Sequence, residues 1–450
     1  MSPARDRGVD ALRLVATVGV VLGHWLVTAP TVVDGVVRLD SPLRTMPALA
    51  PASWLLQTLG VFFLVAGFGA ARGWSARDTG WGGWWWLRVR GLAGPVGALV
   101  AVVLLVAVAA GLHGAAQSLV RVVVLLSLSP LWFLGVHLAL LAATPLLVRL
   151  DSRFGAAAAA LPATLAVLAP LAGDLAAQTA VLTAWWVPWQ LGIALSRRPL
   201  PRPGALLLLA GGVAGVLVLV LAAGFPATAV GVRGALRSNL DPPSAATVCL
   251  ALAQAGLCSL ALPRLGRLAL RVLGPRVPDR WVLPAFLLHL PVLVALWLAT
   301  LPWAPLPGLH DAPVDAGWLL ARAGWVLAVA GVLVAAGPCR RLARSAGDAL
   351  RHRAGGDRLG HGEGDPPVQR AGNDVVGPRL VADHVGDGGR GSELHPLGDP
   401  GGAGVDGPAE DPGEGQHVVD LVGLAAAAGG DDGGVPRGHH RVHLGDRVGQ

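Results

Sequence analysis

The sequence has no lysine and no tyrosine, and charged residues make up only 14% of its 450 residues. Soluble domains carry about 25% charged residues, so this low fraction excludes an ordinary soluble fold. The three cysteines form no C-x-x-C pair and indicate neither a metal site nor a disulfide framework. All four glutamates lie beyond residue 360, so a catalytic acid or base in the preceding part must be Asp or His, with Cys as the remaining alternative.

Long apolar runs fill most of the first 340 residues, and the mean hydropathy of the chain is +0.58. A helix needs about 20 mainly apolar residues to cross a bilayer. We therefore predict an all-α, polytopic integral membrane bundle of about ten transmembrane helices, the first of which is a span and not a cleavable signal peptide. The predicted spans cover residues 10–30, 53–71, 92–112, 131–149, 155–171, 179–196, 205–224, 245–263, 281–301 and 318–337.

The distribution of arginine predicts the orientation of these spans. With the N-terminus in the cytoplasm, 21 arginines fall in inside segments and five fall in outside loops. Such an excess follows the positive-inside rule. The pattern predicts a multi-pass protein of the cell membrane with both termini in the cytoplasm. Because the arginines are explained by topology, nucleic acid is not an expected partner.

The chain divides into a predicted membrane domain, residues 1–345, and a tail, residues 346–450. The net charge changes from +16 over residues 1–353 to −9 over residues 354–450. The tail is a Gly, Asp, Val, His and Arg mixture without helical or strand periodicity, so we predict a disordered cytoplasmic extension. A frameshifted reading frame is the alternative origin. Most histidines of the tail are far apart in the sequence, so the tail is not favoured as a metal-binding segment.

The first predicted helix carries three ionisable residues, Asp10, Arg13 and His24. Ionisable groups at membrane depth are costly and mark functional sites. Arg13 and His24 are 11 residues apart, which places them on one helix face about 16 Å apart along the axis. Asp10 precedes Arg13 by three residues and is expected to pair with it. The pattern suits an anionic donor held at one end with a base at its reactive end. The structural alternative is an interfacial arginine and a hydrogen-bonded bundle histidine.

Several motifs occur in an order that resembles the membrane acyltransferase 3 family. The spacing from Arg13 to His24 resembles the R-x10-H signature of its first helix. Together the matches span about residues 5–340. The further matches follow in order along the chain: a second helix with a trailing arginine at 61–74 (VFFLVAGFGAARGW), a Leu-Trp-Phe-Leu helix entry within 129–147, an outer-loop element of actinobacterial members at 238–247 (SNLDPPSAAT), and a late helix with a Leu-His pair at 286–296.

The resemblance implies O-acyl transfer from cytoplasmic acyl-CoA, usually acetyl-CoA, to a hydroxyl of a cell-envelope glycan or lipid-linked acceptor. In that scheme His24 is the base or acyl relay, Arg13 is its charged partner beside Asp10, and Arg72 is a donor-side cation. The thioester oxyanion would be stabilised by Arg13, by the indole N–H of Trp132 or by a backbone amide, and these stay open. No metal and no bound cofactor are implied, and the lipid bilayer is the other expected partner.

The sequence departs from the family pattern in two ways. The family commonly places an arginine before the proline at the start of its third helix, whereas here Gly94 precedes Pro95. Arg88 and Arg90 are the nearest cations and become candidate donor ligands. Tyrosines that are frequent in relatives are absent. An inactive scaffold is therefore one alternative function, and a transporter is another, although no matching sequence halves of the transporter kind are visible.

Four further polar residues are candidates for a role in the site. His289 and His137 lie in apolar helices, where substrate binding and a structural hydrogen bond are both open, and the family position favours His289. Asn239 and Asp241 precede two prolines in a predicted outer loop, where acceptor binding and turn formation are the alternatives. The tryptophan-rich run at 81–86 is expected to anchor the chain at the membrane interface.

Overall fold

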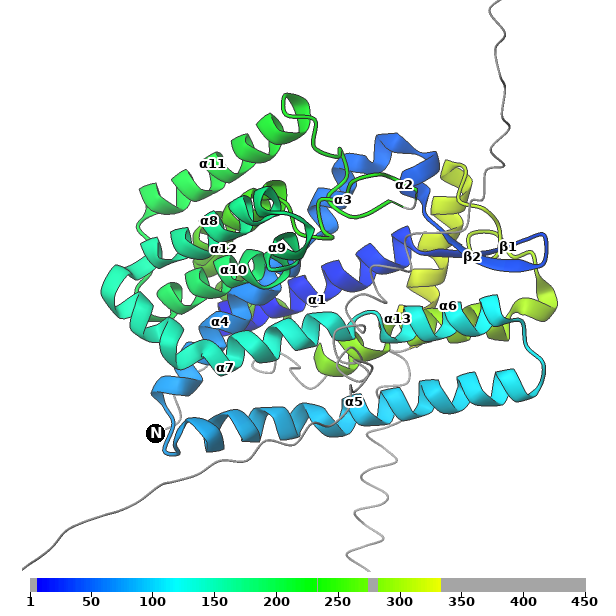
Figure 1. The fold of residues 1–450 in the computed structure, drawn as a ribbon, viewed down its shortest axis with the longest axis horizontal. Helices are drawn as coiled ribbons and strands as arrows, with labels where there is room; N and C mark the ends of the chain where they lie inside the picture. The colour runs from blue at the N-terminus through cyan, green and yellow to red at the C-terminus, as the bar shows by residue number, and fades with distance from the viewer. Residues whose placement is uncertain (1–5, 233, 274–281, 333–450) are drawn as a thin grey trace, which may run out of the picture. The chain divides into compact units, whose positions relative to one another are not determined.

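The computed structural model describes residues 6–232, 234–273 and 282–332. This part of the chain is helical apart from one short β-hairpin (Figure 1). The prediction of an all-α membrane bundle is therefore confirmed in its main feature. The predicted tail, residues 346–450, lies outside the described residues, and so does its boundary with the membrane domain.

The first half of the described chain contains the 32-residue helix α5 together with shorter helices and one pair of strands. In chain order its elements are α1 (Arg7–Val27), β1 (Ala29–Val33), β2 (Val36–Asp40), α2 (Pro42–Thr45), a 3-10 turn (Pro47–Leu49), α3 (Ala50–Leu56), α4 (Leu59–Ser75), α5 (Trp81–Leu112), α6 (Gln117–Leu128) and α7 (Leu131–Phe154).

The second half continues with helices that follow one another closely. In chain order its elements are a 3-10 turn (Gly155–Ala159), α8 (Ala160–Leu168), a 3-10 turn (Ala169–Ala172), α9 (Asp174–Gln178), α10 (Ala180–Arg197), α11 (Arg202–Leu221), α12 (Ala245–Leu273), α13 (Val282–Ala299), a 3-10 turn (Leu301–Trp303) and a further apolar helix, Ala316–Val332.

Seven helical segments of the described chain are long and apolar enough to cross a membrane. One of them, Gln117–Ala172, contains two of the predicted spans. Two other predicted spans coincide with helices outside the seven. The span at 179–196 is α10, and the span at 318–337 begins in the shorter apolar helix Ala316–Val332 and ends beyond the described residues. The described parts of the predicted spans thus fall mainly on helix, and the first span also includes Ala29 and Pro30 of strand β1.

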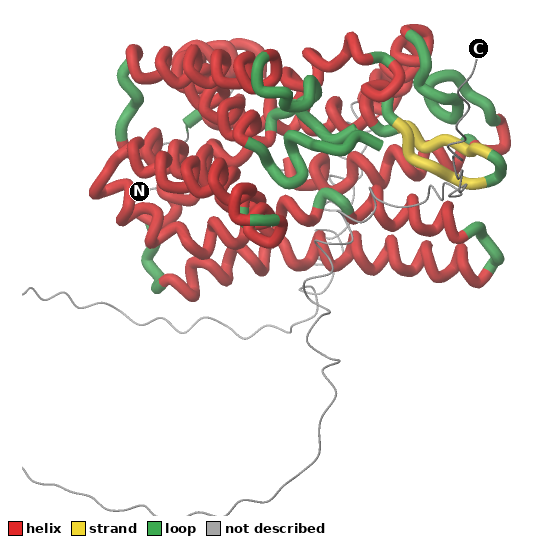
Figure 2. Tube along the Cα trace, turned by 45° about the horizontal axis from the view of Figure 1, so that its top comes forward, coloured by secondary structure: helices red, strands yellow, loops and turns green. Residues whose placement is uncertain are grey.

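The β-hairpin was not predicted, because its residues were assigned to an outer loop. Strands β1 and β2 are antiparallel, with Val33 opposite Val36 (Figure 2). The two residues between them, Asp34 and Gly35, both have positive φ values, 52° and 74°. An Asp-Gly pair between β-branched residues is a strong short-range signal for a two-residue hairpin turn. The signal was therefore present in the sequence.

Helix α6 was also not predicted as a separate element. At 12 residues it is too short to cross a bilayer by itself. Its buried residues Val122, Val123 and Leu126 belong to the same apolar cluster as the buried residues of α13, against which α6 packs. The amphipathic helix therefore covers one side of α13.

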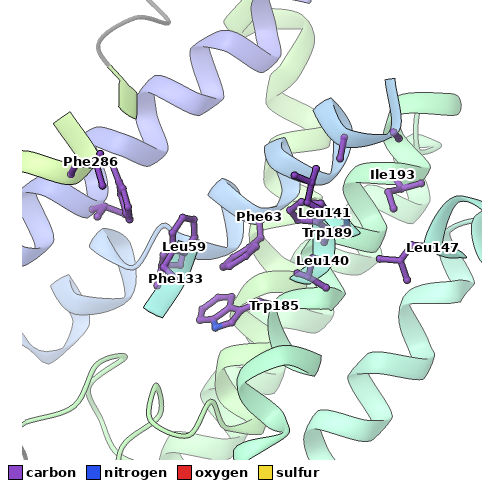
Figure 3. Packing of buried hydrophobic residues seen from close by; sticks show 14 of the residues in the cluster. Leu59, Phe63, Phe133, Leu140, Leu141, Leu147, Trp185, Trp189, Ile193 and Phe286 are labelled. Atoms are coloured by element: carbon purple, nitrogen blue, oxygen red, sulfur yellow. The ribbon is translucent and has the colours of Figure 1, made fainter. Parts of the chain in front are cut away.

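A glycine crossing joins α4 to α10 at the centre of the bundle. A Cβ atom on Gly67 would overlap the backbone of Trp189, and one on Gly192 would overlap the backbone of Leu64. Small residues let helix backbones approach closely in membrane proteins. Around the crossing Phe63 of α4 stacks on Trp185 of α10, with ring centroids 5.3 Å apart (Figure 3). This packing fixes α4, which carries part of the candidate site.

Helix α1 lies among three other helices, because it packs against α4, α12 and α13. The hydroxyl of Thr58, at the start of α4, donates to the Ala16 carbonyl oxygen at 2.8 Å. Gly8, in the first turn of α1, lies close to Leu262 of α12. Helix α1 therefore contacts α12 at its start and the beginning of α4 near its middle.

Candidate functional site

The first turns of α1 hold the pair that the sequence predicted. Asp6 caps the helix, since its carboxylate accepts hydrogen bonds from the Gly8 and Val9 amides at 3.0 and 3.2 Å. Asp10 and Arg13 form an ion pair with 3.6 Å between Oδ1 and Nη1. The Asp10 side chain is 8% exposed and the Arg13 side chain 31%. The pairing expected from the three-residue spacing is present.

Three arginines gather around the last turns of α4, and we call Arg13, Arg72 and Arg88 the cation cluster. The Arg13 guanidinium points at α4, since its Nη2 lies 3.8 Å from the place of a Cβ on Gly69. Arg72 follows one turn later, with its Cζ 5.7 Å from the Phe68 ring centroid. Arg13 and Arg72 were predicted separately, and both lie at the last turns of α4.

Arg88 reaches the same end of α4 from α5. Its guanidinium lies over the Trp84 ring at 4.1 Å and donates to the Trp84 carbonyl oxygen at 2.9 Å. The Trp84 indole N–H in turn donates to the Gly73 carbonyl oxygen at 2.9 Å. Arg90, two residues further along α5, is exposed and is not part of this arrangement. Of the two arginines predicted near Pro95, only Arg88 joins the cluster.

His24 lies near the other end of α1, beside His289 of α13. The two imidazole rings are in edge-to-face contact, with centroids 5.0 Å apart and an angle of 61° between the planes. The indole N–H of Trp25 donates to the His289 carbonyl oxygen at 2.8 Å and so ties α1 to α13. The structure thus places His289 beside His24, and we call His24 and His289 the imidazole pair.

The hydrogen bond of His289 assigns its tautomer. Nδ1 lies 2.6 Å from the Phe286 carbonyl oxygen, which can only accept, so Nδ1 carries the proton. In the neutral ring Nε2 then has a free lone pair. This atom is buried and has no hydrogen-bond partner among the described residues. The pair therefore offers an unprotonated nitrogen inside the protein.

Arg13 and His24 share a face of one continuous helix but do not meet. Eleven residues of helix separate them by about 16 Å. The ion-pair partner of Arg13 is Asp10, while the ring neighbour of His24 is His289. Arg13 and His24 therefore belong to two separate groups, one near each end of α1, and the role of Arg13 as the charged partner of His24 stays a prediction from the family resemblance.

Trp132 and His137 of α7 lie on the side of the bundle that faces α10. The Trp132 ring is 6.5 Å from Trp185, and the His137 ring is 5.3 Å from Trp189. His137 Nδ1 is buried without a hydrogen-bond partner among the described residues. Among the described residues, neither ring stacks on His24 or His289. The structure therefore does not place the Trp132 N–H beside the imidazole pair.

The two candidate residues of the outer loop, Asn239 and Asp241, differ in their surroundings. The Asn239 amide donates to the carbonyl oxygens of Pro226 and Thr228 at 2.7 and 2.8 Å, and its oxygen accepts from the Ser244 hydroxyl at 2.8 Å. Because these bonds use the buried amide to shape the loop, the turn alternative describes Asn239 better than acceptor binding does. Asp241 is at the loop surface, and partial burial raises the pKa of its carboxyl group.

One buried residue near the imidazole pair was not predicted. Arg322 is fully buried, and its Nε donates to the Trp25 carbonyl oxygen at 2.8 Å, one residue from His24. An arginine inside a predicted span was the available signal, since such residues mark functional sites by default. The motifs that carry the family resemblance do not include it.

Comparison with known proteins gives one match. The model of the acyltransferase 3 family, described as an acyltransferase domain, matches residues 6–339. The match includes the cation cluster, the imidazole pair and Arg322. No curated protein and no solved structure matches the chain.

Proposed function

The chain belongs to the acyltransferase 3 family and is a membrane acyltransferase, and on this premise we propose a donor, an acceptor and a site for the reaction. The donor is acyl-CoA, which we take to be acetyl-CoA, and the acceptor is a hydroxyl of a cell-envelope glycan or lipid-linked molecule. The observation that carries the proposal is the arrangement on α1. A cation cluster stands at one end of the helix and a buried imidazole pair at the other.

The cation cluster suits the anionic part of the donor. Acyl-CoA carries its phosphates at one end and its thioester at the end of a long flexible arm. Guanidinium groups bind phosphate oxygens through charge-assisted, often bidentate hydrogen bonds. Arg13, Arg72 and Arg88 converge on one end of α4 and would hold the phosphates there. The arm would then run along α1 toward His24.

The imidazole pair suits the reacting end. A hydroxyl is a weak nucleophile and needs a base to remove its proton. We assign this role to His24, with the free Nε2 of His289 beside it as a second acceptor for the proton. The acceptor oxygen attacks the thioester carbonyl carbon, a C–O bond forms and the C–S bond breaks. The proton taken from the hydroxyl passes to the departing thiolate and gives free CoA thiol.

The predicted topology agrees with this division. With the N-terminus in the cytoplasm of a cell-membrane protein, the cation cluster faces the compartment that holds acyl-CoA. The imidazole pair then lies toward the outer end of α1, near the side from which an envelope acceptor would come. We propose this orientation on the strength of the arginine distribution.

Label transfer tests the proposal. Membrane vesicles with the intact protein, with His24→Ala, with His113→Ala or with no expressed protein receive radiolabelled acetyl-CoA, and label is counted in glycan and lipid fractions. His113 is an exposed histidine after α5 and is the matched control. We expect label with the intact protein and His113→Ala only. Equal label with His24→Ala would refute the assigned base, and no label with any folded protein would favour the scaffold or transporter alternatives.

A further inference from the structure

Arg322 is a buried cation that bonds to three backbone carbonyl oxygens. It lies in the helix Ala316–Val332 and is 0% exposed. Its Nε donates to Trp25 O at 2.8 Å, its Nη1 to Gly308 O at 3.0 Å, and its Nη2 to Thr28 O. Among the described residues its hydrogen bonds go to carbonyl oxygens, and the Asp311 carboxylate adds a favourable electrostatic interaction.

Two of those carbonyls belong to the last turn and the C-cap of α1. The last carbonyls of a helix lack intrahelical partners and form the negative end of its dipole. The Arg322 guanidinium satisfies Trp25 O and Thr28 O with a positive charge. The same turn contains His24, whose own carbonyl accepts from the Thr28 amide at 3.0 Å. Arg322 therefore holds the end of α1 at two positions that follow His24.

The neighbouring parts of the chain pack closely against Arg322. Gly308 has a φ of 72°, and a Cβ there would lie 2.5 Å from the Arg322 amide nitrogen, so a side chain would clash. The Gly308 amide donates to Asp311 at 2.7 Å, and the Trp318 ring lies 5.1 Å from the guanidinium carbon. Burying an arginine costs free energy unless its hydrogen bonds are satisfied. The carbonyl of Gly308 in the loop before the helix and the two carbonyls at the end of α1 satisfy these hydrogen bonds.

A second hydrogen bond links the residues bound by Arg322 to His289. Trp25, whose carbonyl binds Arg322, uses its indole N–H to hold the His289 carbonyl at 2.8 Å. One guanidinium thus fixes the turn that bears His24 and the residue that ties His289 to it. A substitution of Arg322 would change how the His24 and His289 rings face each other. It would leave the cation cluster unchanged, because that cluster lies toward the other end of α1.

We infer that Arg322 is a positioning residue for acyl transfer, which locks the last turn of α1 so that His24 faces His289. This inference rests on the proposed function. It predicts that Arg322→Lys, which keeps the charge but loses the planar fork, lowers kcat by about 10- to 100-fold and changes the KM for acetyl-CoA by less than about twofold. Arg237→Lys in the exposed outer loop is the matched control and should leave both unchanged.

Chemical rescue separates positioning from a general loss of structure. Arg322→Ala leaves a space into which free guanidinium can bind. Millimolar guanidinium should restore part of the kcat of Arg322→Ala and should not stimulate the intact protein or Arg322→Lys. A folded Arg322→Lys with unchanged kcat would overturn the inference, and so would a raised KM with unchanged kcat, because that pattern assigns Arg322 to donor binding.

Cross-linking tests the geometry without enzymatic activity. The variant His24→Cys, His289→Cys, in a chain whose three native cysteines are replaced by alanine, is treated with a short bis-maleimide in membranes. We expect efficient linking with Arg322 present and at least about a fivefold loss with Arg322→Lys. Equal linking in both would overturn the inference. Loss of linking, in combination with a protein that retains His24 and His289 but transfers no acyl group, would support positioning while the proposed function fails, so the two outcomes stay distinguishable.

Discussion

The two ends of α1 differ in how far their charged and polar side chains are exposed. Near its start, Arg13 is 31% exposed, and Arg72 and Arg88 are only partly buried. Near its end, His289 and Arg322 are buried, and hydrogen bonds fix α1 to α13 and to the helix Ala316–Val332. A charged donor must exchange its water for protein contacts, which requires accessible cations. Proton transfer gains from a dry site whose groups are fixed in advance. In the proposed function this difference supports donor binding at one end of α1 and chemistry at the other.

Removal of an imidazole is the most severe test of this division. His24→Ala should lower kcat by about 10²- to 10⁴-fold, the range typical for loss of a general base. Its KM for acetyl-CoA should stay within about twofold, because the cation cluster is intact. His289→Ala should give a smaller loss of kcat. Steady-state kinetics on purified protein in lipid discs measures both, and a KM that rises as much as kcat falls would break the comparison.

The next largest effect is expected from a substitution at the glycine crossing of α4 and α10, which should lower the stability of the protein. Gly192→Ala places a methyl group on the backbone of Leu64, so α4 and α10 must move apart. Overpacking of this kind costs about 1–3 kcal/mol. Thermal unfolding in detergent should show a lower Tm for Gly192→Ala. Gly211→Ala on α11, where a Cβ meets nothing within 4 Å, is the control and should not lower the Tm. Equal Tm values for all three proteins would contradict the close approach.

Loss of one donor-side cation should have the smallest effect. Arg72→Ala is expected to raise the KM for acetyl-CoA by about tenfold, which corresponds to about 1.4 kcal/mol, with kcat nearly unchanged. The effect should shrink at high salt, since screening weakens exposed charge interactions. Arg90→Ala removes an exposed arginine from the same region of the sequence and should change KM little. If Arg90→Ala matched Arg72→Ala, the cation cluster would be a general charge effect and not a binding site.

The sequence predicted the helices well because hydropathy alone determines where a chain can cross a bilayer. It also predicted the Asp10–Arg13 pair and the single face shared by Arg13 and His24, which follow from helix geometry. The hairpin at Asp34–Gly35 was missed although its turn signal was present. These features are local, and local rules are sufficient to find them.

The long-range parts of the site could not be predicted in the same way. Nothing in the sequence brings Arg88 of α5 to the end of α4, or Arg322 to the end of α1 across 297 positions of chain. The resemblance favoured His289, but only the fold gives its ring contact with His24 and its tautomer. Asn239 illustrates the reverse, since a residue that suited acceptor binding is used up by loop hydrogen bonds.

Binding of a donor that cannot react tests the central claim most directly. Equilibrium binding of free CoA to the intact protein, His24→Ala and Arg72→Ala in lipid discs separates recognition from chemistry. The account predicts that His24→Ala binds CoA within about twofold of the intact protein, whereas Arg72→Ala binds it about tenfold more weakly. Binding that is weakened as much by His24→Ala as by Arg72→Ala would contradict the division of α1 into a binding end and a reacting end.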